Sequence, residues 1–457
     1  MRPFSHFHFS YSFKYIRLAI ILSVVPLVQA LLALDIPGLT SILGQELIIL
    51  AAIFTFALLQ WRAAGYHWGH GRITVQQGLL VRRQQVISRP MVAAVQLRRP
   101  LHYRILGASQ VTFYYKYRRD AVTLCLRQAE ALELADEMMP LRREDNVFRA
   151  VRAERLRFAV LSANLITTAV LAVVSARRTI DILGEGINEF ALTNLARVEK
   201  LVEQVLPVGM AWLFLLIFLL ASAAFLLSFL HTAGFSVCRN GGVILARGGL
   251  ITKTERRILA SAVSCCDVRI TPIARLLRRS AVYLQAGGFS GDDLPLMVYK
   301  RGAEDQLQKL MPEFQFSRSG FAPLRGRSLV QFLWLPGGAF LFAAALTGVS
   351  AWVMPQVAPL LALPTVLLAI GTLVSLEGFF TENVRRGPGR TLELSYSRFL
   401  TRHRVCVFSQ NAAFVFTQHP LLAHRQRCNL RVRLPARGSF RVRGLPDYLA
   451  RELPLII

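Results

Sequence analysis

Six long apolar stretches constrain this chain of 457 residues more than any other feature. A helix needs roughly 17–25 largely apolar residues to cross a bilayer, and these stretches reach or approach that length. Hydrophobic residues make up 53% of the chain and charged residues only 18%, which is more apolar than a typical soluble protein. We therefore expect a multi-pass α-helical membrane protein with six transmembrane helices in three pairs. The predicted spans are Leu18–Leu34, Leu47–Trp61, Phe158–Ala176, Val205–Leu230, Ser328–Val353 and Val357–Phe380.

The basic residues predict how these helices are oriented. Lys14 and Arg17 precede the first stretch, whereas the linker that follows it carries Asp35 and Glu46 and no base. Because Lys and Arg accumulate on the cytoplasmic side of membrane helices, both termini and the large polar blocks should be cytoplasmic, with 177–203 as an outer loop. A cleaved signal peptide containing the first stretch remains an alternative.

The polar blocks between the helix pairs predict β-rich domains. ITVQQGLLVRR, VTFYYKYR and AVTLCLR alternate apolar and polar residues, as half-buried strands do. Each block ends in a short stretch with helical spacing of apolar residues. The predicted division is 1–62 (N-terminal segment and helices one and two), 63–140 (first β domain), 157–231 (helices three and four), 232–315 (second β domain), 328–380 (helices five and six) and 385–457 (third β domain).

The first two blocks are predicted to be repeats. An offset of 171 residues aligns 78–113 with 249–284 without a gap and gives nine identities in 36 positions. Gly78 and Gly249 coincide where two strands should meet in a tight turn. The third block is a degenerate copy, because Phe399 stands where the turn glycine is expected.

The cysteines do not predict a disulfide framework. All six lie in blocks assigned to the cytoplasm, where thiols stay reduced. The adjacent Cys265 and Cys266 lack a second CxxC or a spaced histidine that would complete a metal site. We expect both to be small buried or half-buried strand residues.

The repeated order of helix pair, strand, Gly-Leu-aliphatic turn, strand, basic loop and closing helix resembles the bacterial membrane-flanked pleckstrin-homology-like (PH-like) family, specifically its YdbT-like members. This resemblance implies three PH-like β domains, each closed by a C-terminal helix, in the bacterial plasma (inner) membrane. It also implies a smaller companion membrane protein with one PH-like domain, and a role in envelope stress or tolerance of antimicrobial compounds.

Motifs for catalysis are absent from the sequence. It contains no phosphate-binding P-loop, no HExxH and no GxSxG with plausible partners. The histidine pairs His67/His70 and His419/His424 lack the further ligands of a metal site. We therefore expect a non-enzymatic protein without catalytic residues, cofactor or metal. A transporter or lipid flippase formed by the six helices, with regulatory PH-like domains, is the alternative function.

The arginines of the first two blocks are the candidate binding residues. The chain carries 54 Lys and Arg against 27 Asp and Glu, and in a membrane protein anionic phospholipid headgroups are the expected partner. Nucleic acid is not expected, because aromatic stacking platforms are not evident. The same arginines can instead pair internally, bind a protein partner or set topology, and the oligomeric state is open. The candidates are Arg82, Arg83, Arg98, Arg99, Arg104, Arg256, Arg257, Arg269, Arg275, Arg278 and Arg279.

Overall fold

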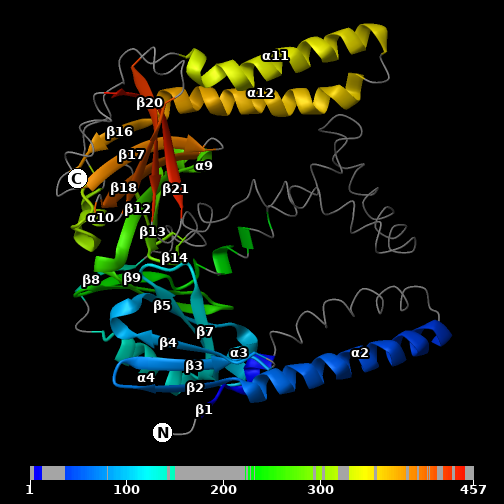
Figure 1. Ribbon diagram of the computed structural model, residues 1–457, viewed down its shortest axis with the longest axis vertical. Helices are drawn as coiled ribbons and strands as arrows, with labels where there is room; N and C mark the ends of the chain where they lie inside the picture. The colour runs from blue at the N-terminus through cyan, green and yellow to red at the C-terminus, as the bar shows by residue number, and fades with distance from the viewer. Residues whose placement is uncertain are drawn as a thin grey trace.

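In the computed structural model, strands dominate the part of the chain that is described, and they form four sheets (Figure 1). The described residues are 5–12, 36–79, 81–141, 145–149, 232–291, 295–300, 304–316, 329–354, 358–387, 391–398, 401–408, 412–418, 426–434 and 438–447, with residue 410 and a few positions between 222 and 230.

The prediction of a six-helix membrane protein is wrong. Among the described residues, two helices are long and apolar enough to cross a membrane, Phe332–Val353 and Pro364–Thr381, and a shorter apolar stretch is Leu47–Ala63. The expected spans at 18–34, 158–176 and most of 205–230 lie outside the described residues. The apolar stretches were given more weight than the polar blocks in the fold class, whereas the β domains of the polar blocks build most of the described structure.

Three β modules follow one another along the chain. The first contains β2 (Gly65–Gly69), β3 (Arg72–Gln77), β4 (Arg83–Ser88), η2 (Arg89–Met91), β5 (Val92–Arg99), α3 (Leu101–Ile105), β6 (Ala108–Tyr115), β7 (Ala121–Arg127) and α4 (Gln128–Met138). The N-terminal β1 (Ser5–His6) pairs with β2, η1 (Phe9–Ser12) follows it, and α2 (Ile36–Ala63) leads into the module.

The second module has the same order of elements with one added strand of two residues, β14. It contains β9 (Ser236–Asn240), β10 (Val243–Gly248), β11 (Lys253–Leu259), η3 (Ala260–Ala262), β12 (Val263–Ile270), α9 (Pro272–Leu276), β13 (Arg279–Ala286), β14 (Phe289–Ser290), β15 (Met297–Lys300) and α10 (Asp305–Leu310). A separate strand, β8 (Asp145–Arg149), pairs with β9.

The third module follows the helix pair α11 (Val330–Val353) and α12 (Ala358–Thr381). It contains β16 (Asn383–Arg386), β17 (Thr391–Arg398), β18 (Thr401–Phe408), β19 (Ala413–Thr417), β20 (Arg427–Arg433) and β21 (Ser439–Pro446). The closing helix expected after β21 falls at 448–457, outside the described residues.

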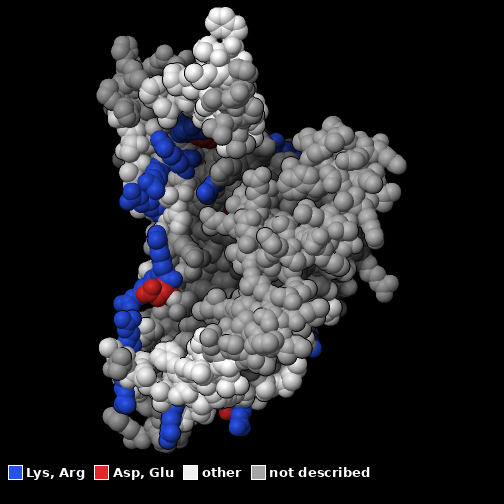
Figure 2. Space-filling view, turned by 90° about the vertical axis from the view of Figure 1, so that its right-hand side faces the viewer, with Lys and Arg blue, Asp and Glu red and all other residues white. Residues whose placement is uncertain are grey.

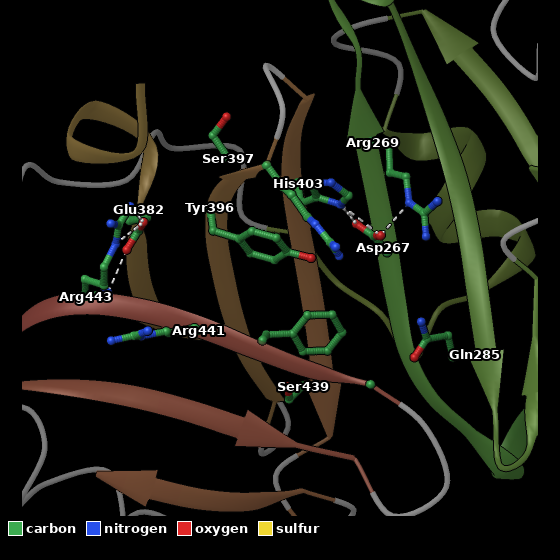
Figure 3. A pocket seen from close by; sticks show the side chains of 13 residues that line it. Asp267, Arg269, Gln285, Glu382, Tyr396, Ser397, His403, Ser439, Arg441 and Arg443 are labelled. Carbon is green, nitrogen blue, oxygen red and sulfur yellow. Dashed lines mark hydrogen bonds and ion pairs between the residues drawn. The ribbon is translucent and has the colours of Figure 1, made fainter. Parts of the chain in front are cut away.

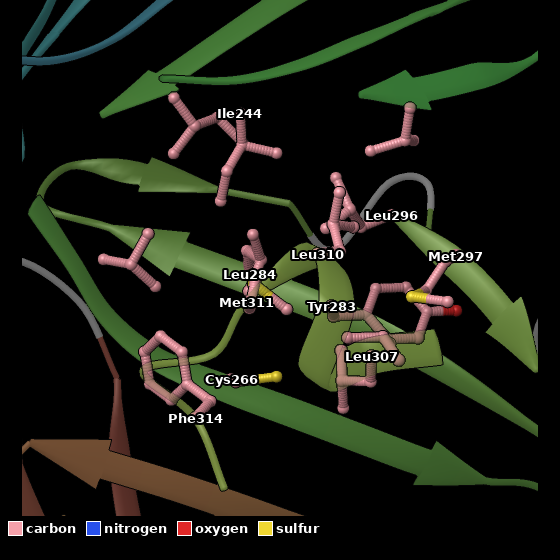
Figure 4. Close-up of a cluster of buried hydrophobic side chains, with 14 of the residues drawn as sticks. Ile244, Cys266, Tyr283, Leu284, Leu296, Met297, Leu307, Leu310, Met311 and Phe314 are labelled. Carbon is pink, nitrogen blue, oxygen red and sulfur yellow. The ribbon is translucent and has the colours of Figure 1, made fainter. Parts of the chain in front are cut away.

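Each module packs an N-terminal sheet of three strands against a C-terminal sheet. In the second module, Ile244 of β10 and Leu284 of β13 lie in one hydrophobic core, together with Leu307 and Leu310 of α10 (Figure 4). In the first, Ile73 and Ile87 of the N-terminal sheet share a core with Val111 of β6 and Leu134 of α4. Burying a side chain of this size contributes roughly 1.5–3 kcal/mol, so these cores hold the two sheets of a module together.

The modules are joined edge to edge by strand pairing. Antiparallel β5 and β11 connect the first and second modules into one seven-stranded sheet, and β12 and β18 connect the second and third modules in the same way. The C-terminal sheet of each module therefore continues into the N-terminal sheet of the next. Backbone hydrogen bonds cross both junctions, so the modules form one stack (Figure 1).

The helices α2, α11 and α12 project from the same side of this stack (Figure 1). The protein covers little of α11 and α12, since 6% of each apolar window is buried. Trp352 and Phe342 of α11 are 88% and 72% exposed. The two helices pack on each other, and the Oγ1 atoms of Thr347 and Thr365 lie 2.8 Å apart across the pair.

The predicted turn glycines and buried cysteines are confirmed. Gly78 and Gly249 follow β3 and β10 with positive φ angles of 113° and 98°. A Cβ at Gly78 would lie 2.1 Å from the carbonyl oxygen of Val81, so the turn requires glycine. Cys265 and Cys266 are fully buried in β12, and all six cysteines are free and buried.

Candidate functional site

A polar pocket lies where the second and third modules meet, beside the base of the helix pair (Figure 3). Its volume is about 670 Å³. The walls come from the paired strands β12 and β18, from β17 and β21, and from the residue that follows α12. The charged and aromatic residues that line it are Asp267, Arg269, Glu382, Tyr396, Arg398, His403, Phe440, Arg441 and Arg443.

One wall holds a buried carboxylate between two basic side chains. The Nε atom of Arg269 donates to Oδ2 of Asp267 at 2.7 Å, and Nδ1 of His403 lies 3.1 Å from the same oxygen. The β12–β18 ladder creates this cluster, because it places Arg269 directly opposite His403. Burial acts to raise the pKa of Asp267, but His403 and Arg269 outweigh it and hold that pKa below its ordinary value.

An aromatic side chain covers this cluster. The ring of Tyr396 stacks on the ring of His403 with centroids 4.7 Å apart and planes only 2° from parallel. Burial, followed by the charge of Asp267, raises the pKa of the Tyr396 phenol. The phenol therefore stays protonated at neutral pH and retains a hydrogen to donate.

The opposite wall connects the pocket to the helix pair. Glu382, which directly follows α12, accepts hydrogen bonds from Nε and Nη2 of Arg443 at 2.9 and 2.7 Å, and from the Arg443 backbone N–H at 2.6 Å. The same guanidinium lies 4.4 Å from the ring centroid of Phe332, near the start of α11. Figure 3 shows Tyr396 between this ion pair and the Asp267 cluster.

The charge balance of the pocket favours an anion. Among the described lining residues, four arginines stand against two carboxylates, and each carboxylate is engaged by an arginine of the pocket wall. Arg398 and Arg441 are exposed and lie in the same lining. Guanidinium groups bind phosphate and carboxylate oxygens through parallel N–H donors, so the pocket is suited to a phosphate-bearing group.

The Asp267 cluster predicts a pH dependence of stability. A carboxylate whose folded pKa is depressed contributes stability that is complete above its unfolded pKa, about 3.9, and is lost as the pH falls through the folded pKa. We therefore expect the wild-type advantage over Asp267→Asn, measured by denaturant unfolding, to be largest at neutral pH and to shrink below about pH 4. An advantage that stays constant over this range would contradict the role of the charge.

A second hollow of about 540 Å³ lies at the base of α2. Phe56 and Gln60 of α2 and Val75 of β3 contribute to its wall, and Arg83 is the only charged residue in the described part of its lining. Because it offers one positive charge rather than four, it is the weaker candidate for an anion site.

The predicted arginines of the first module do not gather at the pocket. Arg82, Arg83 and Arg98 are exposed, and Arg99 is half-buried at the end of β5. Arg104 donates from Nη1 to the carbonyl oxygen of Leu250 at 3.0 Å, so it contacts the turn of the next module. Figure 2 shows basic side chains spread along one edge of the described surface.

The predicted arginines of the second module have different environments. Arg257 is buried and pairs with Glu255 and Asp136, while Arg275 pairs with Glu377 of α12. The guanidinium of Arg256 lies 5.9 Å from the ring centroid of Phe289, Arg278 is exposed and Arg279 is half-buried. Arg269 alone of the predicted set reaches the pocket.

Sequence reasoning missed most of the pocket, because its residues come from the third module. His403, Tyr396, Arg398, Arg441 and Arg443 are brought to Arg269 by the pairing of β12 with β18 and by the packing of β21. A usable signal was present in the sequence, since RVRG at 441–444 places two arginines on alternate positions of a strand, and alternate positions share a face.

The chain contains a bacterial PH domain. Residues 18–141 match the family described as bacterial PH domain, which covers the first module and the residues ahead of it. No curated protein and no solved structure matches the sequence.

Proposed function

We propose that this protein is a non-enzymatic, membrane-anchored binding protein that holds the phosphate of an anionic lipid headgroup in the pocket between its second and third modules. The observation that carries the proposal is the position of four pocket arginines beside two uncovered apolar helices. The match to a bacterial PH domain is compatible with a binding or scaffold role.

Exposed apolar surface supports the membrane anchor. A helix of 24 residues, the length of α11 and of α12, extends about 36 Å, which is sufficient to cross a hydrocarbon core of about 30 Å. Trp334, Leu341 and Val366 are among the large side chains that these helices leave exposed. Water contact with such a surface is unfavourable, whereas lipid contact is favourable.

The end of the helix pair that carries the pocket is assigned to the cytoplasmic leaflet. In the sequence, RGRSL precedes α11 and VRRGPGR follows α12, whereas no charged residue lies in the connection between the two helices. The positive-inside preference therefore supports our proposal that the modules lie in the cytoplasm, against the inner face of a bacterial plasma membrane.

Proximity makes the pocket effective for a headgroup. Because Arg443 contacts Phe332 near the start of α11, the pocket lies beside the end of the helix pair, where lipid phosphates would surround the helices. Each basic residue near an anionic surface contributes about 1 kcal/mol, and membrane anchoring raises the local headgroup concentration. We further propose that the second and third modules are PH-like, since both begin with three consecutive antiparallel strands that correspond to β2, β3 and β4 of the first.

Native mass spectrometry of the full chain in detergent tests this function with added phosphatidylglycerol or phosphatidylcholine. We expect more bound phosphatidylglycerol, and a loss of about thirtyfold in its binding for Arg398→Gln with Arg441→Gln, from about 1 kcal/mol for each arginine. The matched control is Arg433→Gln, because Arg433 is exposed on the neighbouring β20 but does not line the pocket.

Two outcomes would count against the proposal. Equal binding of both lipids would exclude headgroup charge as the determinant, and equal loss in the Arg433→Gln control would exclude the pocket. Soluble glycerol phosphate provides a further arm: displacement of the lipid at low concentration would identify a free phosphate ester, rather than the headgroup, as the ligand.

A further inference from the structure

The two ends of the module stack carry strand edges that have no partner among the described residues. In the second and third modules, the third strand (β11 or β18) pairs with the first strand of the preceding C-terminal sheet (β5 or β12). The equivalent third strand of the first module is β4, and it pairs with β3 alone. The equivalent of β5 and β12 in the third module is β19, which pairs with β20 alone.

We propose that β4 of one copy of this chain pairs with β19 of a second copy, so that the protein assembles head to tail through the same junction that joins its own modules. Both internal junctions are antiparallel ladders of six residue pairs. The strands β4 and β19 have six and five residues, so they are long enough to form a similar ladder.

The chemistry of both edges fits a strand partner. Natural proteins protect exposed sheet edges with charges, prolines or bulges. The stretch NAAFVFTQ at 411–418, which contains β19, has no charge and no proline. On β4, Val86 is 55% exposed, whereas the corresponding residue of β11 under the 171-residue offset is Arg257, which is buried at the junction. The β19 edge is therefore uncharged, and the β4 edge, although polar at Arg83, Gln84 and Gln85, exposes Val86 at the position that the junction covers on β11.

The geometry of the stack favours a second copy of this chain as the occupant. The first module offers one β4-type edge and the third module one β19-type edge, which are the two complementary halves of the internal junction. Such a heterologous contact generates an open series or a ring rather than a symmetric pair. Because α2, α11 and α12 project from one side of the stack, adding copies by a junction of this kind is compatible with all helices entering one membrane.

Blocked-edge variants of the full chain in detergent test this assembly by mass photometry. We expect the wild type to form dimers and longer species as concentration rises. Gln84→Lys with Val86→Lys, which charges β4, and Ala413→Lys with Thr417→Lys, which charges β19, should each remain single chains. Tyr117→Lys provides the matched control on an exposed loop and should assemble like the wild type.

A mixture of the two blocked variants provides the decisive measurement. Each variant retains the edge that the other lacks, so the mixture should form dimers and stop there, which would also show that both variants are folded. Self-association of either variant alone would overturn the head-to-tail contact in favour of a symmetric one. If the wild type stays a single chain at every concentration, or pairs only with a different protein, the partner strand does not come from a second copy of this chain.

Discussion

Arg257→Ala is expected to lower the opening free energy of the β5–β11 ladder by about 3–5 kcal/mol, the usual loss when one partner of a buried ion pair is removed. The side chain of Arg257 is 2% exposed, its Nη2 lies 2.9 Å from Oε1 of Glu255, and its Nη1 donates to the carbonyl oxygen of Met139 at 3.2 Å. It also pairs with Asp136 of α4. Removing it leaves Glu255 without this buried partner at the junction between two modules.

Native-state hydrogen exchange of the β5 and β11 amides in the full chain measures this loss directly. The control is Arg247→Ala, because Arg247 pairs with the same Glu255 at 3.0 Å but its side chain is 46% exposed. That variant should cost less than about 1 kcal/mol, as exposed ion pairs do. Glu255→Leu combined with Arg257→Met should recover much of the loss. Equal losses for Arg257→Ala and Arg247→Ala would contradict the role of burial.

Gly287→Ala is expected to separate the same two modules at a second point. Gly287 lies between β13 and β14 with φ of 52°, and a Cβ there would lie 2.2 Å from the carbonyl oxygen of Tyr115 in the first module. That oxygen also accepts a hydrogen bond from the backbone N–H of Gly288 at 2.8 Å. Positive φ costs roughly 1–2 kcal/mol for alanine, and the displaced hydrogen bond adds about 1 kcal/mol.

Gly107→Ala provides the control that separates the two effects. Gly107 has a φ of 66°, but a Cβ there meets nothing within 4 Å. It should therefore show only the backbone strain of roughly 1–2 kcal/mol. Faster exchange at β6 and β14 in Gly287→Ala than in Gly107→Ala is the expected result, and equal effects would show that the approach of the two modules contributes nothing.

The local β structure could be predicted from the sequence because it depends on neighbouring residues. Alternation around Ile73 and Val75 and the turn at Gly78 correctly predicted strands and their connection. The stretch that ends the first block was correctly predicted to be a helix, observed as α4. Each of these signals lies within about ten residues of chain, so no distant contact was needed.

The junctions and the pocket could not be predicted, because they depend on pairing between strands far apart in the sequence. Nothing near Asp267 indicates that Val405 will lie opposite it, or that His403 will reach its carboxylate. The recurrence of Arg98 and Arg104 at 269 and 275 drew attention to Arg269, but its partners in the third module carried no repeat signal. The implied companion protein and the role in envelope stress stay predictions.

Photolabelling tests most directly whether the pocket binds an anionic lipid headgroup. The full chain would be reconstituted with an anionic phospholipid that carries a photoreactive group in its headgroup, and the labelled peptides identified by mass spectrometry. We expect labelling in β17, β18 and β21, around Arg398, His403 and Arg441, and a loss of that labelling in the variant that combines Arg398→Gln with Arg441→Gln. Labelling confined to α2, α11 and α12, with none in those strands, would contradict it.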